Sequence, residues 1–211
     1  MSTVHELRAE VAGHGLHAVV MGGSAGSIDG LLHVLAALPA ALAVPVLIVV
    51  HLPARSASRA AEVFADRTTL VVRDAVDKEE ARPGLVLFAP ADYHLLVERD
   101  GRVALSLDPP EHFSRPAIDV LFETASRAWG AALLAVLFSG ASEDGAAGLA
   151  AVVGAGGLGW VESPLTAEVP LMPAAGLRDA PGARALTIPE MVDAVAALPV
   201  RTTDPASGSR P

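Results

Sequence analysis

The apolar positions of the chain fall into short continuous runs, separated by longer stretches in which Ala and Leu recur with helical spacing. The runs are rich in β-branched residues and lack polar alternation, which indicates strands buried on both faces of a parallel sheet. Glycine- or proline-marked turns follow them, as is typical of parallel strands joined by crossover helices. We expect strands at residues 17–21, 46–50, 70–72, 133–138, 158–161 and 185–188. We expect helices at about residues 27–38, 56–66, 117–129, 145–153, 171–177 and 189–198.

A different pattern covers residues 84–107, where the segments LVLFAP, HLLVE and VALSL are joined by turn residues. One of these turns contains Asp100-Gly101. An Asp-Gly pair between alternating strands is a hairpin signal. The pattern therefore predicts an antiparallel hairpin near residues 84–107, at or beside the edge of the sheet.

The length and composition of the chain fit one α/β domain. With 211 residues the chain can bury a large core, and 52% apolar against 18% charged residues is far from the composition of disordered chains. We expect the folded domain at residues 16–199, after a lead-in at 1–15. Residues 200–211 lose the apolar pattern, so we expect a disordered tail there.

Charge, cysteine usage and the N-terminus narrow the function further. A formal net charge of -9 repels phosphate backbones, so nucleic acid is not an expected partner. The absence of cysteine excludes disulfides, thiolate zinc sites and cysteine nucleophiles. The start MSTVHELRAEVAGHG lacks the basic and apolar regions of a signal peptide, so we expect a cytoplasmic protein.

Residues 31–50 are nearly all apolar and long enough to cross a bilayer. Pro39 and Pro45 divide this stretch, however, and its second half is β-branched. A buried helix followed by a buried strand fits this pattern better, and we expect no membrane insertion.

Candidate chemistry lies at three points where an expected strand ends and a helix begins. GGSAG (22–26) follows the first strand, HLP (51–53) follows the second, and SGASEDG (139–145) follows the strand at 133–138. In an open parallel sheet, such loops share one edge with the N–H groups of helix N-termini. We therefore expect all three loops to open onto the same edge.

Ser24, His51 and Asp144 are the residue types of a hydrolytic triad. A serine hydroxyl becomes a good nucleophile when a neutral imidazole takes its proton and a carboxylate fixes the tautomer of that imidazole. The glycines around Ser24 let the backbone turn sharply, and N–H groups opening the next helix could hold an oxyanion. The pattern indicates Ser24 as nucleophile, His51 as base and Asp144 as orienting acid.

Each of these residues also has a structural interpretation. Ser24 could merely cap a helix, a lone histidine beside an apolar strand is usually structural, and Asp144 precedes a helix, where aspartate is a favoured N-cap. Glu143 is the rival acid. A glycine-rich turn after the first strand also suggests dinucleotide binding, but its spacing is incomplete and His51 stands where an acidic ribose ligand is expected. The other histidines are interpreted as structural: His5, His14, His17, His33, His94 and His112.

The order of the three residues along the chain separates this pattern from the α/β-hydrolases. Those enzymes run Ser, then acid, then His, whereas this chain runs Ser24, His51, Asp144.

The same segments resemble the motifs of the CheB methylesterase family. GGSAGS (22–27) resembles its glycine-rich serine turn, HLP (51–53) its His-Met-Pro, and SGASEDGAAG (139–148) its Thr-Gly-Met-Gly-x-Asp-Gly loop. The similarity extends to RPAIDVLF (115–122), PGLVLFAPADYHLLV (83–97) and SPLTAEVPLMPAA (163–175). It covers about residues 17–198, nearly the whole folded part.

The resemblance implies a doubly wound, mostly parallel sheet with helices on both faces and an antiparallel hairpin. It implies hydrolysis of glutamate γ-methyl esters on the cytoplasmic domain of chemoreceptors, sometimes with glutamine deamidation, and neither cofactor nor metal. Ser24, His51 and Asp144 match the family's triad, and the backbone N–H groups of Ala25 and Ala141 match its oxyanion donors. Family members usually carry an N-terminal receiver domain. We expect a stand-alone form, either unregulated or controlled by a separate partner such as a response regulator.

The chain departs from the family pattern around the triad. Ala25 replaces a Thr, Ser27 replaces a Gly, Val50 replaces a Gln, and Ala141 and Ser142 replace Met-Gly. These changes leave the triad types intact but bear on substrate fit. A serine esterase or amidase for another carboxyl ester, or a non-catalytic signalling module on the same fold, are therefore alternatives.

Six of the fifteen basic residues lie within 28 positions just after His51. They form either an ordinary solvated surface or a positive rim suited to receptor helices that bear glutamates. These residues are Arg55, Arg59, Arg67, Arg73, Lys78 and Arg82.

Overall fold

Seven parallel strands form the central sheet of the computed structural model, which describes residues 2–51 and 60–201. Across the sheet their order is β3-β4-β2-β1-β7-β8-β9, and every neighbouring pair is parallel. The strands are β1 (Ala18–Gly23), β2 (Val46–Val50), β3 (Val71–Asp74), β4 (Leu85–Phe88), β7 (Leu133–Leu137), β8 (Leu158–Glu162) and β9 (Arg184–Leu186).

The inner strands are apolar throughout because each side chain enters one of two cores. In β2, Val46, Ile48 and Val50 belong to the core on one face of the sheet, while Leu47 and Val49 belong to the core on the other. All five residues are buried. A strand covered on both faces needs no polar alternation, which is why its sequence reads as a continuous run.

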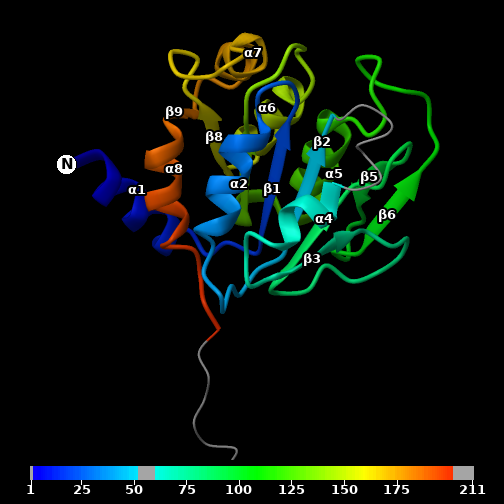
Figure 1. Ribbon diagram of the computed structural model, residues 1–211, viewed down its shortest axis with the longest axis horizontal. Coiled ribbons are helices and arrows are strands. Elements are labelled where there is room, and N and C mark those ends of the chain that lie inside the picture. Colours follow the sequence, from blue (N-terminus) through cyan, green and yellow to red (C-terminus); the bar gives the residue numbers. More distant parts are fainter. Residues whose placement is uncertain (1, 52–59, 202–211) are drawn as a thin grey trace, which may run out of the picture.

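Helices cover both faces of the sheet, as the apolar runs predict (Figure 1). One core takes side chains from α1 (Ser2–Gly13), α2 (Ile28–Ala36), α4 (Ala60–Ala65) and α8 (Ile188–Val195). The other takes side chains from α5 (Ile118–Trp129), α6 (Ala146–Gly154) and α7 (Leu171–Asp179). The short 3-10 helix η1 (Gly130–Ala132) links α5 to β7. The prediction of a doubly wound, mostly parallel α/β sheet is confirmed.

The hairpin prediction near residues 84–107 is correct only in its second half. Strands β5 (His94–Val97) and β6 (Val103–Ser106) pair antiparallel in a sheet of their own, joined through the Asp100-Gly101 turn. LVLFAP instead supplies β4, an interior parallel strand between β3 and β2. Its apolar run is mostly buried between these two strands. Because the segments that follow it alternate, the sequence pattern did not distinguish this parallel strand from the hairpin.

The N-terminal segment is also more ordered than a lead-in. Residues 2–13 form α1, and Leu7 and Val11 are buried in the core shared with α8. Of the expected helix at 56–66, α4 accounts for the described part, because residues 52–59 lie outside the described ranges. The expected tail at 200–211 begins too early: Val200 bridges to Leu42 and the Arg201 N–H donates to the Ala41 carbonyl at 2.8 Å, and the remainder from residue 202 lies outside the described ranges. Within the described ranges, no helix has the length and apolarity that a membrane crossing requires.

The winding of the sheet places the loops of interest together. From β1 the chain moves outward on one side through β2, and later returns to pair β7 with the other side of β1. This reversal of strand order is a switch point, where a crevice forms beyond the carboxyl ends of the strands. The loops after β1, β2 and β7 all leave the sheet at that edge.

Two glycines of α6 provide a test of the packing on the α5 face. A Cβ added at Gly148 would lie 2.5 Å from Phe122 Cβ, whereas one added at Gly154 would meet nothing within 4 Å. We expect Gly148→Ala to lower the free energy of unfolding by about 1–3 kcal/mol through overpacking. Gly154→Ala should leave it unchanged or raise it by up to about 1 kcal/mol, because Ala favours helix. Urea denaturation of both variants measures the difference, and equal stabilities would contradict the described α5–α6 contact.

Candidate active site

Ser24 and His51 lie side by side where β1 and β2 end. The last register pair of these strands is Gly23 with Val50, so the two residues follow at adjacent positions. The His51 backbone N–H donates to the Gly23 carbonyl at 3.0 Å. Both side chains are partly exposed, as a reactive site requires.

The turn that carries Ser24 is fixed by its own backbone and by Ser27. The Ser24 carbonyl accepts the Ser27 hydroxyl at 2.7 Å and the Ser27 N–H at 3.1 Å. Gly26 has a φ of +78°, and a Cβ there would lie 2.8 Å from Ser139 Oγ. This position therefore needs glycine for both conformation and space.

Ser139 and Glu162 brace this turn from the neighbouring strands, and the sequence analysis assigned neither a role. Ser24 N–H donates to the Ser139 carbonyl at 2.9 Å, and the Ser139 hydroxyl donates to the Ala25 carbonyl at 2.9 Å. The Ser139 N–H in turn donates to Glu162 Oε2 at 2.8 Å. Glu162 is buried at the end of β8, and burial raises its pKa. Only the position of Ser139 directly after an apolar strand hinted at this contact.

Asp144 faces His51 across the same edge. His51 Nε2 lies 2.9 Å from Asp144 Oδ2, and the Asp144 side chain is fully buried. The two atoms are within contact distance, although Nε2 meets no hydrogen-bond criterion for direction. A buried carboxylate at this distance stabilises the imidazolium that forms when the ring takes a proton.

Asp144 also caps a helix, although not the one that follows it. Its Oδ2 accepts the Ile118 N–H at 2.7 Å and its Oδ1 accepts the Asp119 N–H at 2.9 Å, at the start of α5. The interpretation of Asp144 as N-cap of its own helix is wrong, because Gly145 occupies that position without a side-chain cap. Burial alone would raise the pKa of Asp144, but His51 and the two N–H groups outweigh it and lower the pKa.

Glu143, the rival acid, points away from this arrangement. Its carboxylate forms a bidentate contact with Arg178 at 3.0 and 3.2 Å, and its side chain is half exposed. Of the two neighbouring acids, Asp144 is the one that reaches His51.

The nucleophile and base are adjacent without being engaged. Within the described residues, the Ser24 hydroxyl and the His51 ring form no hydrogen bond with each other. Nε2 is turned to Asp144, so Nδ1 is the ring nitrogen left for proton transfer with Ser24. Catalytic hydrogen bonds are often loose without substrate, and the arrangement is compatible with the expected roles.

The expected oxyanion donors have no competing partner in the described part of the chain. There, the backbone N–H groups of Ala25 and Ala141 donate to no other residue. Both residues are exposed at the same edge as Ser24. Their assignment as donors stays a prediction, with available N–H groups in its favour.

One cluster in the described ranges has the composition of a metal site: His112, Asp119 and Asp144, with ligand atoms within 4.8 Å of one another. Three of its four carboxylate oxygens already accept the N–H groups of Ile118, Asp119 and Gly148. Helix N-termini favour anions over cations. The donor set therefore fits a hydrogen-bonded carboxylate pair better than a metal site.

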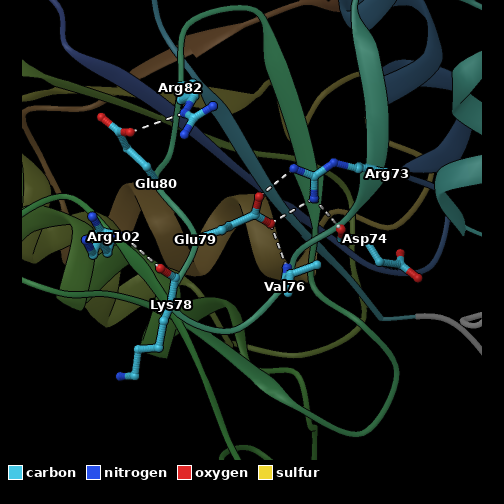
Figure 2. Close-up of polar contacts among 8 residues, drawn as sticks. All are labelled: Arg73, Asp74, Val76, Lys78, Glu79, Glu80, Arg82 and Arg102. Carbon is cyan, nitrogen blue, oxygen red and sulfur yellow. Dashed lines mark hydrogen bonds and ion pairs between the residues drawn. The ribbon is translucent and has the colours of Figure 1, made fainter.

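The positive rim predicted after His51 is largely neutralised where the structure describes it. Arg73 makes a bidentate contact with Glu79, and Arg82 contacts Glu80 at 3.2 Å (Figure 2). Lys78 pairs with Glu98 at 2.7 Å. Such paired charges form an ordinary surface network, so the interpretation as a free cationic rim loses support. Arg67 is exposed and forms no ion pair within the described residues, and Arg55 and Arg59 lie outside them.

Comparisons with known proteins agree with this fold. The family model described as CheB methylesterase matches residues 19–195. A curated protein of Leptospira interrogans is 42% identical over 156 residues, which cover 74% of this chain and 81% of that protein. A Symbiobacterium thermophilum protein-glutamate methylesterase/protein-glutamine glutaminase is 35% identical over 84% of this chain, and the match spans 49% of its length. The crystal structure of the Thermotoga maritima CheB methylesterase catalytic domain superposes with a TM-score of 0.81 at 27% identity, covering 86% of this chain and 97% of that one.

The two neighbouring acids give a direct test of the site's construction. Asp144→Ala leaves two buried N–H groups and His51 without their acceptor, and we expect a loss of about 2–4 kcal/mol at neutral pH. Because the pKa of Asp144 is lowered on folding, its stabilisation is present above its ordinary pKa and is lost as pH falls through the folded value. The difference from wild type should therefore shrink in acid.

Glu143→Ala is the matched control, since it removes only an exposed ion pair. Chemical denaturation at pH 7 and below pH about 4 measures both variants. Equal effects of the two substitutions at pH 7 would contradict the described contacts of Asp144.

Proposed function

Because the chain belongs to the CheB methylesterase family, we propose that it is a serine hydrolase that cleaves glutamate γ-methyl esters on the cytoplasmic domains of chemoreceptors. The observation that carries the proposal is the contact of buried Asp144 with His51, at the strand ends where His51 lies next to Ser24. The names of the relatives support the reaction class, since they combine methylesterase and glutaminase activities.

In this mechanism the Ser24 oxygen attacks the ester carbonyl while His51 takes the hydroxyl proton. The N–H groups of Ala25 and Ala141 hold the oxyanion of the tetrahedral intermediate. His51 returns the proton to the leaving oxygen, methanol departs, and an acyl-enzyme remains. Water then repeats the sequence with His51 as base and releases glutamate. Asp144 keeps the ring oriented and stabilises its cationic form.

The same steps deamidate glutamine, because only the leaving group differs. An amide carbonyl takes the place of the ester, and His51 protonates the departing ammonia. None of these steps calls for a cofactor. The proposed substrate is the cytoplasmic domain of a receptor, so in this proposal the enzyme acts in the cytoplasm. A separate response regulator is a candidate controlling partner.

A second candidate function is hydrolysis of another carboxyl ester. The observation that favours it is the altered pair of loops facing the nucleophile, where Ala25 and Ala141 present methyl groups in place of larger side chains. Both residues are exposed, so their side chains are available to a substrate. Turnover of small carboxyl esters with none on methylated receptors would favour this function over the first.

Loss of the nucleophile tests the mechanism. Purified protein incubated with methyl-labelled receptor should release labelled methanol, and Ser24→Ala should lower the rate by at least about 1,000-fold. Ser106→Ala is the matched control and should keep wild-type activity. It removes an exposed hydroxyl at the end of β6 that donates a hydrogen bond to Asp108. Undiminished release by Ser24→Ala would overturn the mechanism.

A further inference from the structure

Two buried aspartates lie at the starts of two helices, and each accepts N–H groups from the start of the other helix. Asp144 lies just before α6 but accepts the first N–H groups of α5. Asp119 lies in the first turn of α5, and its Oδ1 accepts the Gly148 N–H of α6 at 2.7 Å. The two carboxylates lie within 4.8 Å of each other. The start of each helix is therefore hydrogen-bonded by an aspartate that lies at the start of the other helix.

His112 closes this pair from the outside. Its Nε2 lies 3.2 Å from Asp119 Oδ2, and its ring is 46% exposed while Asp119 is 4% exposed. His112 belongs to a loop in which it and Phe113 have positive φ values of 49° and 63°. The loop thus presents a titratable ring to a carboxyl group that is almost wholly buried. The sequence pattern indicated no partner for His112.

Within the described residues, few other titratable groups face Asp119. The elements that pack most extensively against α5 are α6, β5, β1, η1, β7 and β2, and only β5 among them carries a titratable side chain. That residue, His94, is already bonded to the Pro109 carbonyl at 3.1 Å and the Ala117 N–H at 3.1 Å. The groups that control the charge of Asp119 are therefore His112, Asp144 and, through Asp144, His51.

We propose that Asp119 is a positioning residue whose carboxylate, held between His112 and the start of α6, sets the place and the effective charge of Asp144 and so the pH range in which His51 is a base. The idea rests on the role assigned to His51 in the proposed function. A second negative charge beside Asp144 favours the protonated ring, because like-signed carboxylates both attract the same cation.

The protonation of Asp119 falls in the range where this matters. Burial and the neighbouring Asp144 raise the pKa of Asp119 to about 6, against the lowering effects of Gly148 and His112. Asp119 is therefore ionised at neutral pH and loses its charge in mild acid.

The test is a histidine-ring NMR titration of the full chain without substrate, with the His51 signal identified by its loss in His51→Gln. Asp119→Asn keeps an oxygen acceptor for the Gly148 N–H but removes the charge. We expect the His51 ring to titrate at a pH lower by about 0.5 unit or more, since the lost negative charge lies beside Asp144, the carboxylate that contacts the ring. Asp193→Asn, on the exposed face of α8, removes one charge far from the pair and should give no shift.

A His51 titration in Asp119→Asn that matches the Asp193→Asn control would overturn the proposal and leave Asp119 a helix cap only. If Asp119→Asn does not fold, carboxyl-carbon NMR of the wild-type chain decides. The Asp119 carboxyl signal should then titrate near pH 6 and the His51 ring signal should change in response to that step, and a His51 signal that does not respond to it would overturn the proposal. Both readouts need no turnover, so they distinguish failure of this proposal from failure of the methylesterase assignment.

Discussion

The site is organised around one buried carboxylate. Asp144 is fully buried, and a charge in that position is costly unless its oxygens are satisfied. The N–H groups of Ile118 and Asp119 and the ring of His51 satisfy them together. This single group therefore ties the loop after β7 to the start of α5 and to the end of β2. Moving any one of these elements would leave a buried charge or buried N–H groups without partners.

The parallel winding makes that arrangement possible. Strands β2, β1 and β7 are neighbours, so their carboxyl ends deliver His51, Ser24 and the Asp144 loop to one edge. The same edge collects the starts of helices, which supply the N–H groups that a buried carboxylate needs. Fold and chemistry thus depend on one another at the switch point of the sheet.

Sequence patterns predicted the elements that depend on local periodicity. Residues 46–50 were placed correctly because a strand buried on both faces leaves a continuous apolar run. The run at Leu85–Phe88 was assigned to a hairpin because its neighbours alternate, and nothing local shows that its partners are β2 and β3. The helix at Ser2–Gly13 was missed because few of its side chains are apolar, although Leu7 and Val11 are buried.

The triad types could be predicted from strand ends, but the contacts that orient them could not. The partner of Asp144 at Ile118 is 26 residues away in the chain, and the local rule pointed to the wrong helix. Likewise, the link between Ser139 and Glu162 joins two strands through a buried bond that has no sequence signature. Contacts of this kind follow from tertiary packing alone.

The central claim is that Ser24 is a nucleophile activated by His51. Its most direct test is covalent labelling with a fluorophosphonate, followed by mass-spectrometric mapping of the modified peptide. We expect one modified residue, Ser24, and loss of the label in His51→Gln even though the serine remains. Labelling at another serine, or labelling of Ser24 that is undiminished in His51→Gln, would contradict it.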